Sequence, residues 1–363
     1  MTSPLDSYTR SMSELRFSDE AKSRLVDALR KAEKNTRAET PAKVLNLPAR
    51  RPARRARRWT RVAAGLALAL VLGGGATVAV ASGVLPNPAD VLSDIFGDAP
   101  AQTELLNEVG RPLGASATSN GVTVTAEAVV GDRSSCAVVY SIEFDDPAAL
   151  EEIEPGEDGT LPLVSDATRH VDGTIARGGG AWFYDADPSD DTIQYVETMG
   201  FTTWNGTGII GRTARFSMNK IEVCDEQGVS ATLVSGSWNL KFEMNYVDTT
   251  VELPAGQTTT WQGAAVTIDA VAVSSVGAAV DYTIDRQAGD LESSAKVTAL
   301  PVTVTLTDGT TFDATDANTS NTYARESGGT CTVNEKIVFD RIVSVDDIVS
   351  VTVGGAEIPV SAA

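Results

Sequence analysis

The chain has 363 residues, 42% of them hydrophobic, which is enough for two or three units with cores of ordinary size. Its formal net charge of −20 is unevenly distributed: residues 1–61 hold 16 basic and 7 acidic residues, a net charge of +9, and the remaining residues carry −29. This division argues against a single soluble domain and is typical of a protein whose two ends lie in different compartments.

Residues 1–61 are predicted to be a basic cytoplasmic tail that contains one amphipathic helix near residues 18–34. Leu25, Val26 and Leu29 recur at helical spacing and form one apolar stripe. Because so short a tail cannot bury this stripe alone, the three residues are candidates for binding a cytoplasmic partner, such as a sigma factor, or the inner leaflet. A frayed helix without a partner is the simpler alternative.

Residues 62–82 are predicted to be one transmembrane helix. The segment reads VAAGLALALVLGGGATVAVAS, and no charge occurs between Arg61 and Asp90, whereas about 20 apolar residues suffice to cross a bilayer. Five arginines are predicted to flank the membrane on the cytoplasmic side: Arg54, Arg55, Arg57, Arg58 and Arg61. Nucleic-acid binding is not expected of this cluster, because it lies against the membrane and lacks interleaved aromatic residues.

A cleaved signal peptide is the alternative interpretation of the same segment. Ala79-Val80-Ala81 fits the small-residue cleavage pattern. The 61 residues before the apolar run are, however, far longer than an ordinary n-region. A retained helix is therefore preferred, which predicts a single-pass cell-membrane protein with a cytoplasmic N-terminus and an extracytoplasmic C-terminal portion.

Residues 83–115 are predicted to be a proline-containing stalk. From Asn120 onward, apolar and polar residues alternate with a period of two, which is typical of half-buried strands. Clear examples are residues 122–130, 136–144 and 238–246. Several such strands separated by turns predict antiparallel, immunoglobulin-like β-sandwiches.

An internal repeat divides the outer portion. Residues 121–143 (GVTVTAEAVVGDRSSCAVVYSIE) align without a gap with residues 263–285 (GAAVTIDAVAVSSVGAAVDYTID), at an offset of 142 and with nine identities that include Tyr140/Tyr282. The alternation keeps the same phase in both, and a slip of one residue would turn every side chain to the other face. We therefore expect two tandem β-domains, at residues 116–255 and 256–363.

Several stretches of the outer portion resemble one known family. EVGRPLGASATSNGVTVTAEAVVGDRSSCAVVYSIE is similar to the start of the DUF4179 domain of bacterial membrane proteins. WFYDADPSDDTIQYVE and GSWNLKFEMNYVDTTVELPAGQ resemble the actinobacterial branch of that family, and the closing IVSVDDIVSVTVGGAEIPV resembles the end of such proteins. The resemblance implies a short cytoplasmic N-terminus, one membrane helix and an outer β-portion. It also implies an architecture like that of membrane-bound partners of extracytoplasmic-function sigma factors, although this tail has no His or Cys with which to form a zinc anti-sigma domain.

No pattern of catalytic residues is found. The one histidine, His170, is expected in an exposed loop, and no G-x-S-x-G, phosphate-binding glycine loop or H-E-x-x-H occurs. We therefore expect no enzyme and no cofactor. One acidic cluster is either a calcium site or, more simply, a solvated turn: Asp185, Asp187, Asp190 and Asp191.

Three cysteines remain: Cys136, Cys224 and Cys331. A Cys136–Cys224 disulfide is one possibility, buried free thiols are another, and zinc is not expected beside a single histidine. Two hypotheses of function follow from the sequence. The outer portion either senses a signal that the tail passes to a cytoplasmic regulator, or it is a structural or ligand-binding module anchored at the cell surface.

Overall fold

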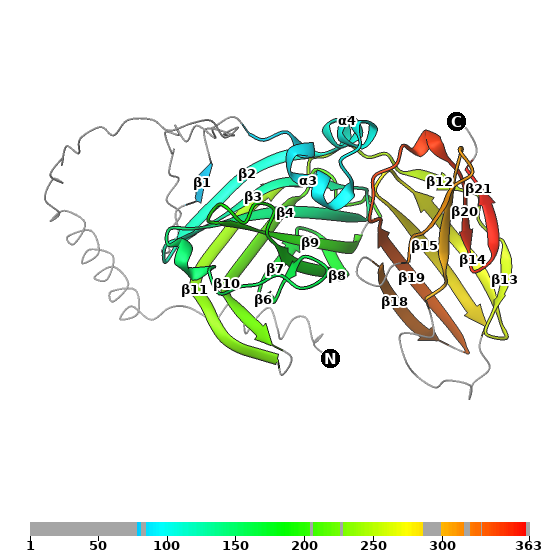
Figure 1. Cartoon of the computed structure of the whole chain (residues 1–363). Helices are drawn as coiled ribbons and strands as arrows, with labels where there is room; N and C mark the ends of the chain where they lie inside the picture. Colours follow the sequence, from blue (N-terminus) through cyan, green and yellow to red (C-terminus); the bar gives the residue numbers. More distant parts are fainter. Residues whose placement is uncertain are drawn as a thin grey trace, which may run out of the picture. The chain divides into compact units, whose positions relative to one another are not determined.

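The computed structural model describes residues 78–80, 85–203, 206–225, 228–285, 299–315, 320–327 and 329–360. The chain divides into two compact units, Met1–Arg61 and Val62–Ala363, and every described residue belongs to the second. The predicted tail, its helix near residues 18–34 and most of the predicted membrane segment thus lie outside the described residues. Within them the architecture is mainly β, with antiparallel sheets arranged as sandwiches, which confirms the prediction of a mainly β, antiparallel fold (Figure 1).

The first sandwich joins a large sheet, in the order β1-β2-β3-β4-β9-β8-β5, to a smaller sheet in which β10 pairs with β11 on one side and with β6 and β7 on the other. Its strands are β1 (Val78–Val80), β2 (Arg111–Ser119), β3 (Val122–Gly131), β4 (Ser135–Phe144), β5 (Thr160–Leu161), β6 (Leu163–Ser165), β7 (Thr168–Val171), β8 (Thr174–Tyr184), β9 (Thr192–Thr203), β10 (Thr213–Asp225) and β11 (Gly228–Glu243). A single apolar core lies between the two sheets, and in it the rings of Tyr140 and Phe216 stack at 4.3 Å.

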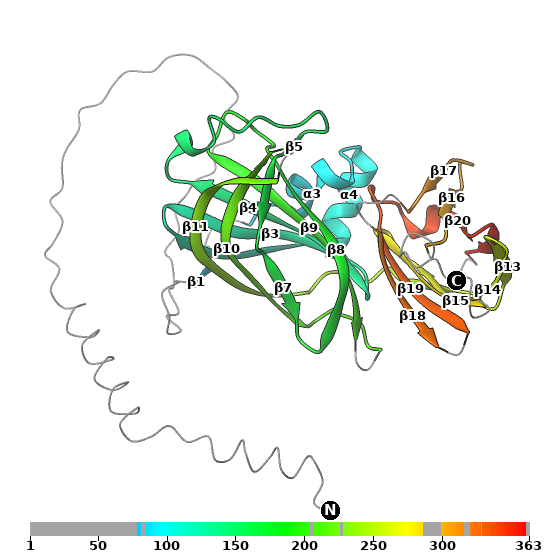
Figure 2. The same cartoon turned by 90° about the horizontal axis from the view of Figure 1, so that it is seen from below.

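The second sandwich has one sheet in the order β12-β14-β15-β19-β18, with β13 also on β14, and a second sheet in the order β17-β16-β20-β21 (Figure 2). Its strands are β12 (Val251–Leu253), β13 (Thr258–Trp261), β14 (Ala264–Val273), β15 (Gly277–Asp285), β16 (Val302–Leu306), β17 (Thr311–Asp313), β18 (Ser320–Ser327), β19 (Thr330–Val338), β20 (Ile348–Val353) and β21 (Ala356–Pro359). It encloses a core of its own, which includes Tyr282 and Val351.

The register of the strands repeats at the offset of 142 residues that the sequence indicates. Ala126 pairs with Tyr140, Ile268 pairs with Tyr282, and a β-bulge follows each of these pairs. Both tyrosines are fully buried. The two sandwiches therefore place their repeated tyrosines at equivalent core positions.

The order of the strands also repeats. β3, β4, β9 and β8 of the first sandwich correspond to β14, β15, β19 and β18 of the second, and β10–β11 corresponds to β20–β21. The turns before β3 and β14 are alike too, because Asn120 and Gln262 both have a positive φ, at 50° and 49°, and each precedes a glycine of positive φ. β2 begins at Arg111 and β12 at Val251, a few residues before the predicted starts of the two domains.

Two helices replace the predicted stalk of residues 83–115. They are α3 (Pro88–Phe96) and α4 (Pro100–Val109), and each has proline at its first position, where the missing N–H costs no hydrogen bond. Leu92, Phe96 and Leu106 are fully buried, and each such side chain stabilises by roughly 1.5–3 kcal/mol. The segment is a packed helix pair beside β3, β4 and β9 (Figures 1 and 2), which corrects the prediction of a stalk.

No helix among the described residues is long and apolar enough to cross a membrane. Three residues of the predicted span, Val78–Val80, are described, and they form strand β1 paired with β2 through Ala115–Ala117. At these three residues the structure differs from the predicted helix, because the backbone pairs with a sheet edge. Residues 62–77 and 81–82 of the predicted span lie outside the described residues.

The glycine run 178–180 lies within strand β8. β8 pairs with β9 across this run, and a Cβ atom on Gly179 would lie 2.1 Å from the carbonyl oxygen of Thr198. Glycine is therefore required here by the close approach of two backbones.

Candidate functional site at the junction of the two sandwiches

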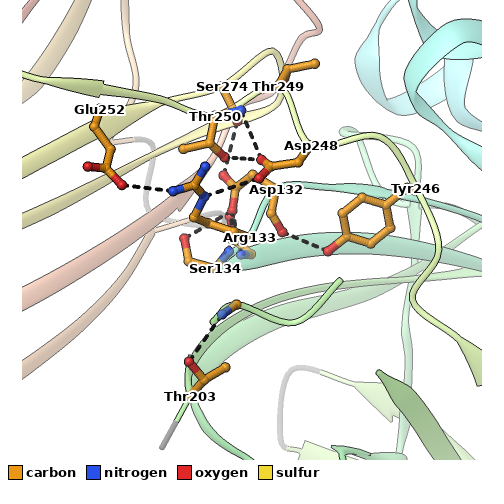
Figure 3. A network of polar contacts seen from close by, with 12 residues as sticks. Asp132, Arg133, Ser134, Thr203, Tyr246, Asp248, Thr249, Thr250, Glu252 and Ser274 are labelled. Atoms are coloured by element: carbon orange, nitrogen blue, oxygen red, sulfur yellow. Dashed lines mark hydrogen bonds and ion pairs between the residues drawn. The ribbon is translucent and has the colours of Figure 1, made fainter. Parts of the chain in front are cut away.

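The turn between β3 and β4 forms the centre of a buried polar network (Figure 3). Asp132 is 3% exposed, and its Oδ1 accepts hydrogen bonds from the backbone N of Ser134 and of Ser135, at 2.7 and 2.8 Å. Tyr246 donates its hydroxyl to the carbonyl oxygen of Asp132 at 2.8 Å. The two bonds to Oδ1 stabilise the buried carboxylate, and the Tyr246 bond fixes the backbone of the turn.

The second oxygen of Asp132 reaches the second sandwich. Ser274 donates its hydroxyl to Asp132 Oδ2 at 3.1 Å, and the same Ser274 Oγ accepts a bond from the backbone N of Val276 at 3.3 Å. Asp132 and Ser274 are separated by 142 residues, so they occupy the same position of the two repeats. Their turns also close alike, since the backbone N of Asp132 donates to Ser135 O and that of Ser274 to Gly277 O, both at 2.8 Å.

Arg133 ties the same turn to the segment that connects the sandwiches. Its Nε lies 3.2 Å from Asp248 Oδ2, and its Nη1 lies 2.9 Å from Glu252 Oε1 (Figure 3). The Arg133 side chain is 41% exposed and that of Glu252 is 76% exposed, so each ion pair contributes at most about 1 kcal/mol. Thr250 holds Asp248 in place by donating its backbone N and its hydroxyl to Oδ1. The two ion pairs of Arg133 therefore orient the segment that connects the sandwiches and add little to the free energy of unfolding.

A cleft of about 440 Å³ opens beside this network. Its floor is the outer face of the β14–β15–β19 sheet, where Ala270, Ala272 and Ala279 present small side chains. The charged residues of its wall are Asp132, Arg133, Glu252, Asp269, Asp281 and Lys336. Lys336 Nζ pairs with Asp281 Oδ1 at 3.3 Å, and Thr283 donates its hydroxyl to Asp269 at 2.7 Å. The cleft is thus polar at its wall, flat at its floor and acidic on balance.

Helices α3 and α4 close the other side of the junction. Their apolar residues share one core with the outer face of the first sandwich and with Val276, Val338 and Ile342 of the second. Two backbone bonds add to this contact: Ile342 N donates to Phe96 O at 3.2 Å, and Val247 N donates to Val109 O at 3.0 Å. The helix pair therefore contacts both sandwiches and the connection between them.

Each sandwich also buries one glutamate at an equivalent position, Glu197 opposite Val138 and Glu335 opposite Val280. Glu197 Oε2 pairs with Arg169 Nε at 3.4 Å, with both side chains almost fully buried. Glu335 instead lies 3.5 Å from the hydroxyl of Tyr282, whose oxygen accepts a bond from Leu300 N at 3.2 Å.

Burial raises the pKa of one group beside each of the two glutamates. It raises the pKa of the Cys136 thiol to about 11, with the charge of Glu197 adding to the effect and Arg169 opposing it. Burial also raises the pKa of Tyr282, and the neighbouring Glu335 raises it further. Neither the thiol nor the phenol ionises near neutral pH, so this thiol is a core side chain and not a reactive group.

The residues predicted as sites fall in different places. The stripe of Leu25, Val26 and Leu29 lies outside the described residues, and so do the membrane-flanking arginines, which are Arg54, Arg55, Arg57, Arg58 and Arg61. His170 is exposed as expected, but it lies on strand β7 rather than in a loop, with Nε2 3.7 Å from Asp172 Oδ1. Of these residues the structure describes only His170, which does not take part in the polar network of the junction.

The three cysteines are free thiols, so the possible Cys136–Cys224 disulfide does not form. Cys136 and Cys331 are buried, and Cys224 is half-buried on β10. The acidic cluster of residues 185–191 forms hydrogen-bonded turns, in which Asp187 accepts bonds from Ser189 and Asp190 accepts one from Thr192 N. In the described part of the chain, no group of three or more His, Cys, Asp or Glu side chains could hold a metal ion.

The junction residues were missed by the sequence analysis. Asp132, Arg133 and Asp248 stand in ordinary turn sequences, and nothing about their spacing marks them as a cluster. One signal was present: the repeat aligns Asp132 with Ser274, both of which commonly begin side-chain-capped turns. Equivalent turns in two repeats do not, however, have to meet in space.

The comparisons with known proteins agree with the resemblance for part of the chain. Residues 54–144 match the model of a family described as "Domain of unknown function (DUF4179)". A solved structure described as "The crystal structure of the conserved domain protein from Bacillus anthracis" is similar, with a TM-score of 0.44 and 16% identity over 67% of this chain and 76% of that chain. No curated protein matches the sequence.

Proposed function

We propose that this chain is a single-pass envelope protein, in which the two sandwiches form a binding or sensing module outside the membrane and residues 1–61 stay in the cytoplasm. The support is the division of charge, +9 before the apolar segment and −29 from that segment onward, together with the arginine cluster at the boundary. A module of this type fits the strand order of the two sandwiches, which we assign to the immunoglobulin-like class.

The observation that carries the proposal is the position of helices α3 and α4. They follow within a few residues of the apolar segment, and their buried side chains form one core with both sandwiches. Any ligand that shifts one sandwich against the other has to disturb this core. A packed core does not deform continuously, so it responds to such a shift by repacking. The helix pair would therefore pass a change at the junction to the chain that enters the membrane.

In this proposal the cytoplasmic stripe of Leu25, Val26 and Leu29 binds a regulator of the extracytoplasmic-function sigma-factor type that the family resemblance suggests. Two buried leucines contribute roughly 1.5–3 kcal/mol each, or about 3–6 kcal/mol together, whereas micromolar binding needs about 8 kcal/mol, so further contacts of the tail have to supply the remainder and the ordering costs. The role that we propose is one of binding, in which the acidic and basic groups of the junction pair with one another or with hydroxyl and backbone donors.

The alternative function is that of a cell-surface structural or ligand-binding module for which the tail serves only as an anchor. The cleft beside Arg133 favours this alternative as much as it favours sensing, because a ligand site is needed in both. What separates the two functions is whether the tail has a specific protein partner.

The test is capture of a cytoplasmic partner by the full chain with and without the stripe. Leu25→Asp combined with Leu29→Asp should abolish capture of a defined sigma-factor partner while membrane insertion is unchanged. Arg54→Ala with Arg55→Ala is the matched control, because it removes charge but leaves the stripe and should not affect capture. Equal capture by the wild type and the Leu double variant would contradict signalling and favour the anchored surface module.

A further inference from the structure

The cleft lies on the outer face of the second sandwich, and the helix seat, meaning the surface under α3 and α4, lies on the equivalent outer face of the first sandwich. In the first sandwich, the outer-face residues that pack against α3 and α4 are Ala128, Val130, Ala137, Val139 and Val196. At the offset of 142, the first four correspond to Ala270, Ala272, Ala279 and Asp281, and all four of these line the cleft. One face of the repeat is thus covered by two helices in the first sandwich and open in the second.

The borders of the two faces correspond as well. Val276, from the β14–β15 turn of the second sandwich, packs against the helix pair on the first. Its counterpart is Ser134, from the β3–β4 turn of the first sandwich, which lines the cleft on the second. Because Asp132 and Ser274 touch each other between these turns, the junction has an approximate two-fold relation, and the cleft is the symmetric counterpart of the helix seat.

The open face differs from the covered one in its chemistry. Val139 is replaced by Asp281, and Glu127 corresponds to Asp269, so carboxylates lie on or beside the alanine floor. Lys336 offsets one of these charges through its pair with Asp281, but the balance of the wall remains acidic. An occupant that resembles α3 and α4 in shape therefore has to present a cationic side chain where the helix pair presents only apolar ones.

We propose that the cleft docks a short helix of another protein, with a small or apolar stripe over Ala270, Ala272 and Ala279 and a lysine or arginine toward Asp269 and Asp281. A second copy of this chain fits poorly, because its outer portion is acidic and would repel the carboxylates of the cleft. The proposal rests on the proposed function in one respect, namely that the sandwiches lie outside the membrane. It adds the binding site and the chemical class of the partner.

Cysteine labelling of the full chain tests the proposal with three positions that the repeat supplies. In a Cys224→Ser background, Ala270→Cys places a thiol on the cleft floor, directly across the strand pair from Asp281. Ala128→Cys is the matched position under the helix pair, and Thr311→Cys is an exposed position on β17. Each variant is reacted with a membrane-impermeant maleimide, once in protoplasts of the native host and once as the purified full chain.

Docking predicts that Ala270→Cys reacts about tenfold more slowly in protoplasts than in the purified chain, which corresponds to a partner present at roughly ten times its Kd. Adding Asp281→Asn should remove most of this difference, while the buried thiols Cys136 and Cys331 stay unreactive in the purified double variant, which shows that both sandwiches are still folded. Ala128→Cys should stay unreactive in both preparations, and Thr311→Cys should react equally in both.

Equal labelling of Ala270→Cys in protoplasts and in the purified chain, with Thr311→Cys reactive, would overturn the docking proposal alone. Slow labelling of Ala270→Cys in the purified chain as well would also overturn it, because this chain itself would then cover the face. If Thr311→Cys failed to react in intact protoplasts, the sandwiches would not lie outside, and the proposed function would fall together with the docking site that rests on it.

Discussion

Asp132 and Ser274 occupy the same position of the two repeats, and their side chains hydrogen-bond each other at 3.1 Å. In symmetric dimers, residues near the axis meet their own counterparts in this way. Here the two partners belong to one chain and differ in chemistry, so that one supplies a buried carboxylate and the other a hydroxyl donor. The junction combines a contact of dimer type with the fixed geometry of a single chain.

We expect Asp132→Ala to lower the free energy of unfolding by about 2–3 kcal/mol, because it leaves buried N–H donors in the turn without an acceptor. Ser274→Ala should cost about 1 kcal/mol. Because the two side chains hydrogen-bond each other, the double variant should lose about 1 kcal/mol less than the sum of the two single variants, as measured by urea denaturation. Additive losses, within the error of about 0.5 kcal/mol, would show that the side chains do not interact.

Tyr140→Phe and Tyr282→Phe should differ although the two residues are equivalent in the repeat. The Tyr282 hydroxyl bonds Leu300 N and lies near Glu335, so its removal leaves buried polar groups unpaired and should cost about 1–3 kcal/mol. The Tyr140 hydroxyl has no hydrogen-bond partner within the described residues, so its removal should change stability by less than about 0.5 kcal/mol. Thermal unfolding of the two variants decides this, and equal losses would contradict the assignment of partners.

Arg169→Met should destabilise the first sandwich by about 3–5 kcal/mol, because Glu197 would remain as an uncompensated buried charge. Adding Glu197→Leu should recover most of that loss, since a well-packed apolar pair can replace a buried ion pair. The measurement is chemical denaturation of the wild type, the single variant and the double variant. A double variant no more stable than Arg169→Met would indicate that the pair is not the source of the effect.

Asp166 should make stability depend on pH in the acid range. Burial alone would raise the pKa of this carboxylate, but the bonds that it accepts from Asn219 and from Lys220 N outweigh burial and lower it below 3.8. A lowered folded-state pKa means that the stabilisation is fully present above about pH 4 and is lost as the pH falls through the folded-state value. Asp166→Asn should therefore be less stable than the wild type at neutral pH, and the difference should shrink below pH 4. A difference that does not vary with pH would contradict this account.

The repeat is the part of the fold that could be predicted best from the sequence. Period-two alternation sets the face of each side chain, and an ungapped match around Tyr140 and Tyr282 therefore implies the same register in both hairpins. The structure has that register, including the bulge after each pair. Local pattern was sufficient here because each hairpin contains its own pairing information.

The helix pair could not be predicted in the same way, although a signal for it was present. Residues 128–130 and 137–139 are apolar without interruption, which is typical of strands covered on both faces. In the second repeat the corresponding run ends at Asp281, which marks the face that stays open. The alternation in the rest of each strand hid this difference, and the prolines of residues 86–100 suggested a stalk when two of them begin helices.

The junction network could not be predicted because it depends on how two separately folded turns meet. Arg133, Asp248 and Asp132 are distant in sequence or lie in unremarkable turns, and only the packing of the sandwiches brings them together. The sequence did predict that His170 would be exposed. What it left open was the place where a ligand or partner could bind.

The most direct test of the central claim is a protease-protection measurement on protoplasts that express the full chain with a different epitope tag at each end. The account predicts that added protease removes the C-terminal tag from intact protoplasts, and that the N-terminal tag is lost only after detergent opens the membrane. Protection of the C-terminal tag in intact protoplasts would contradict the account. So would a mature protein that begins near Ser82 and is found in the medium, because the apolar segment would then be a cleaved signal and not a membrane anchor.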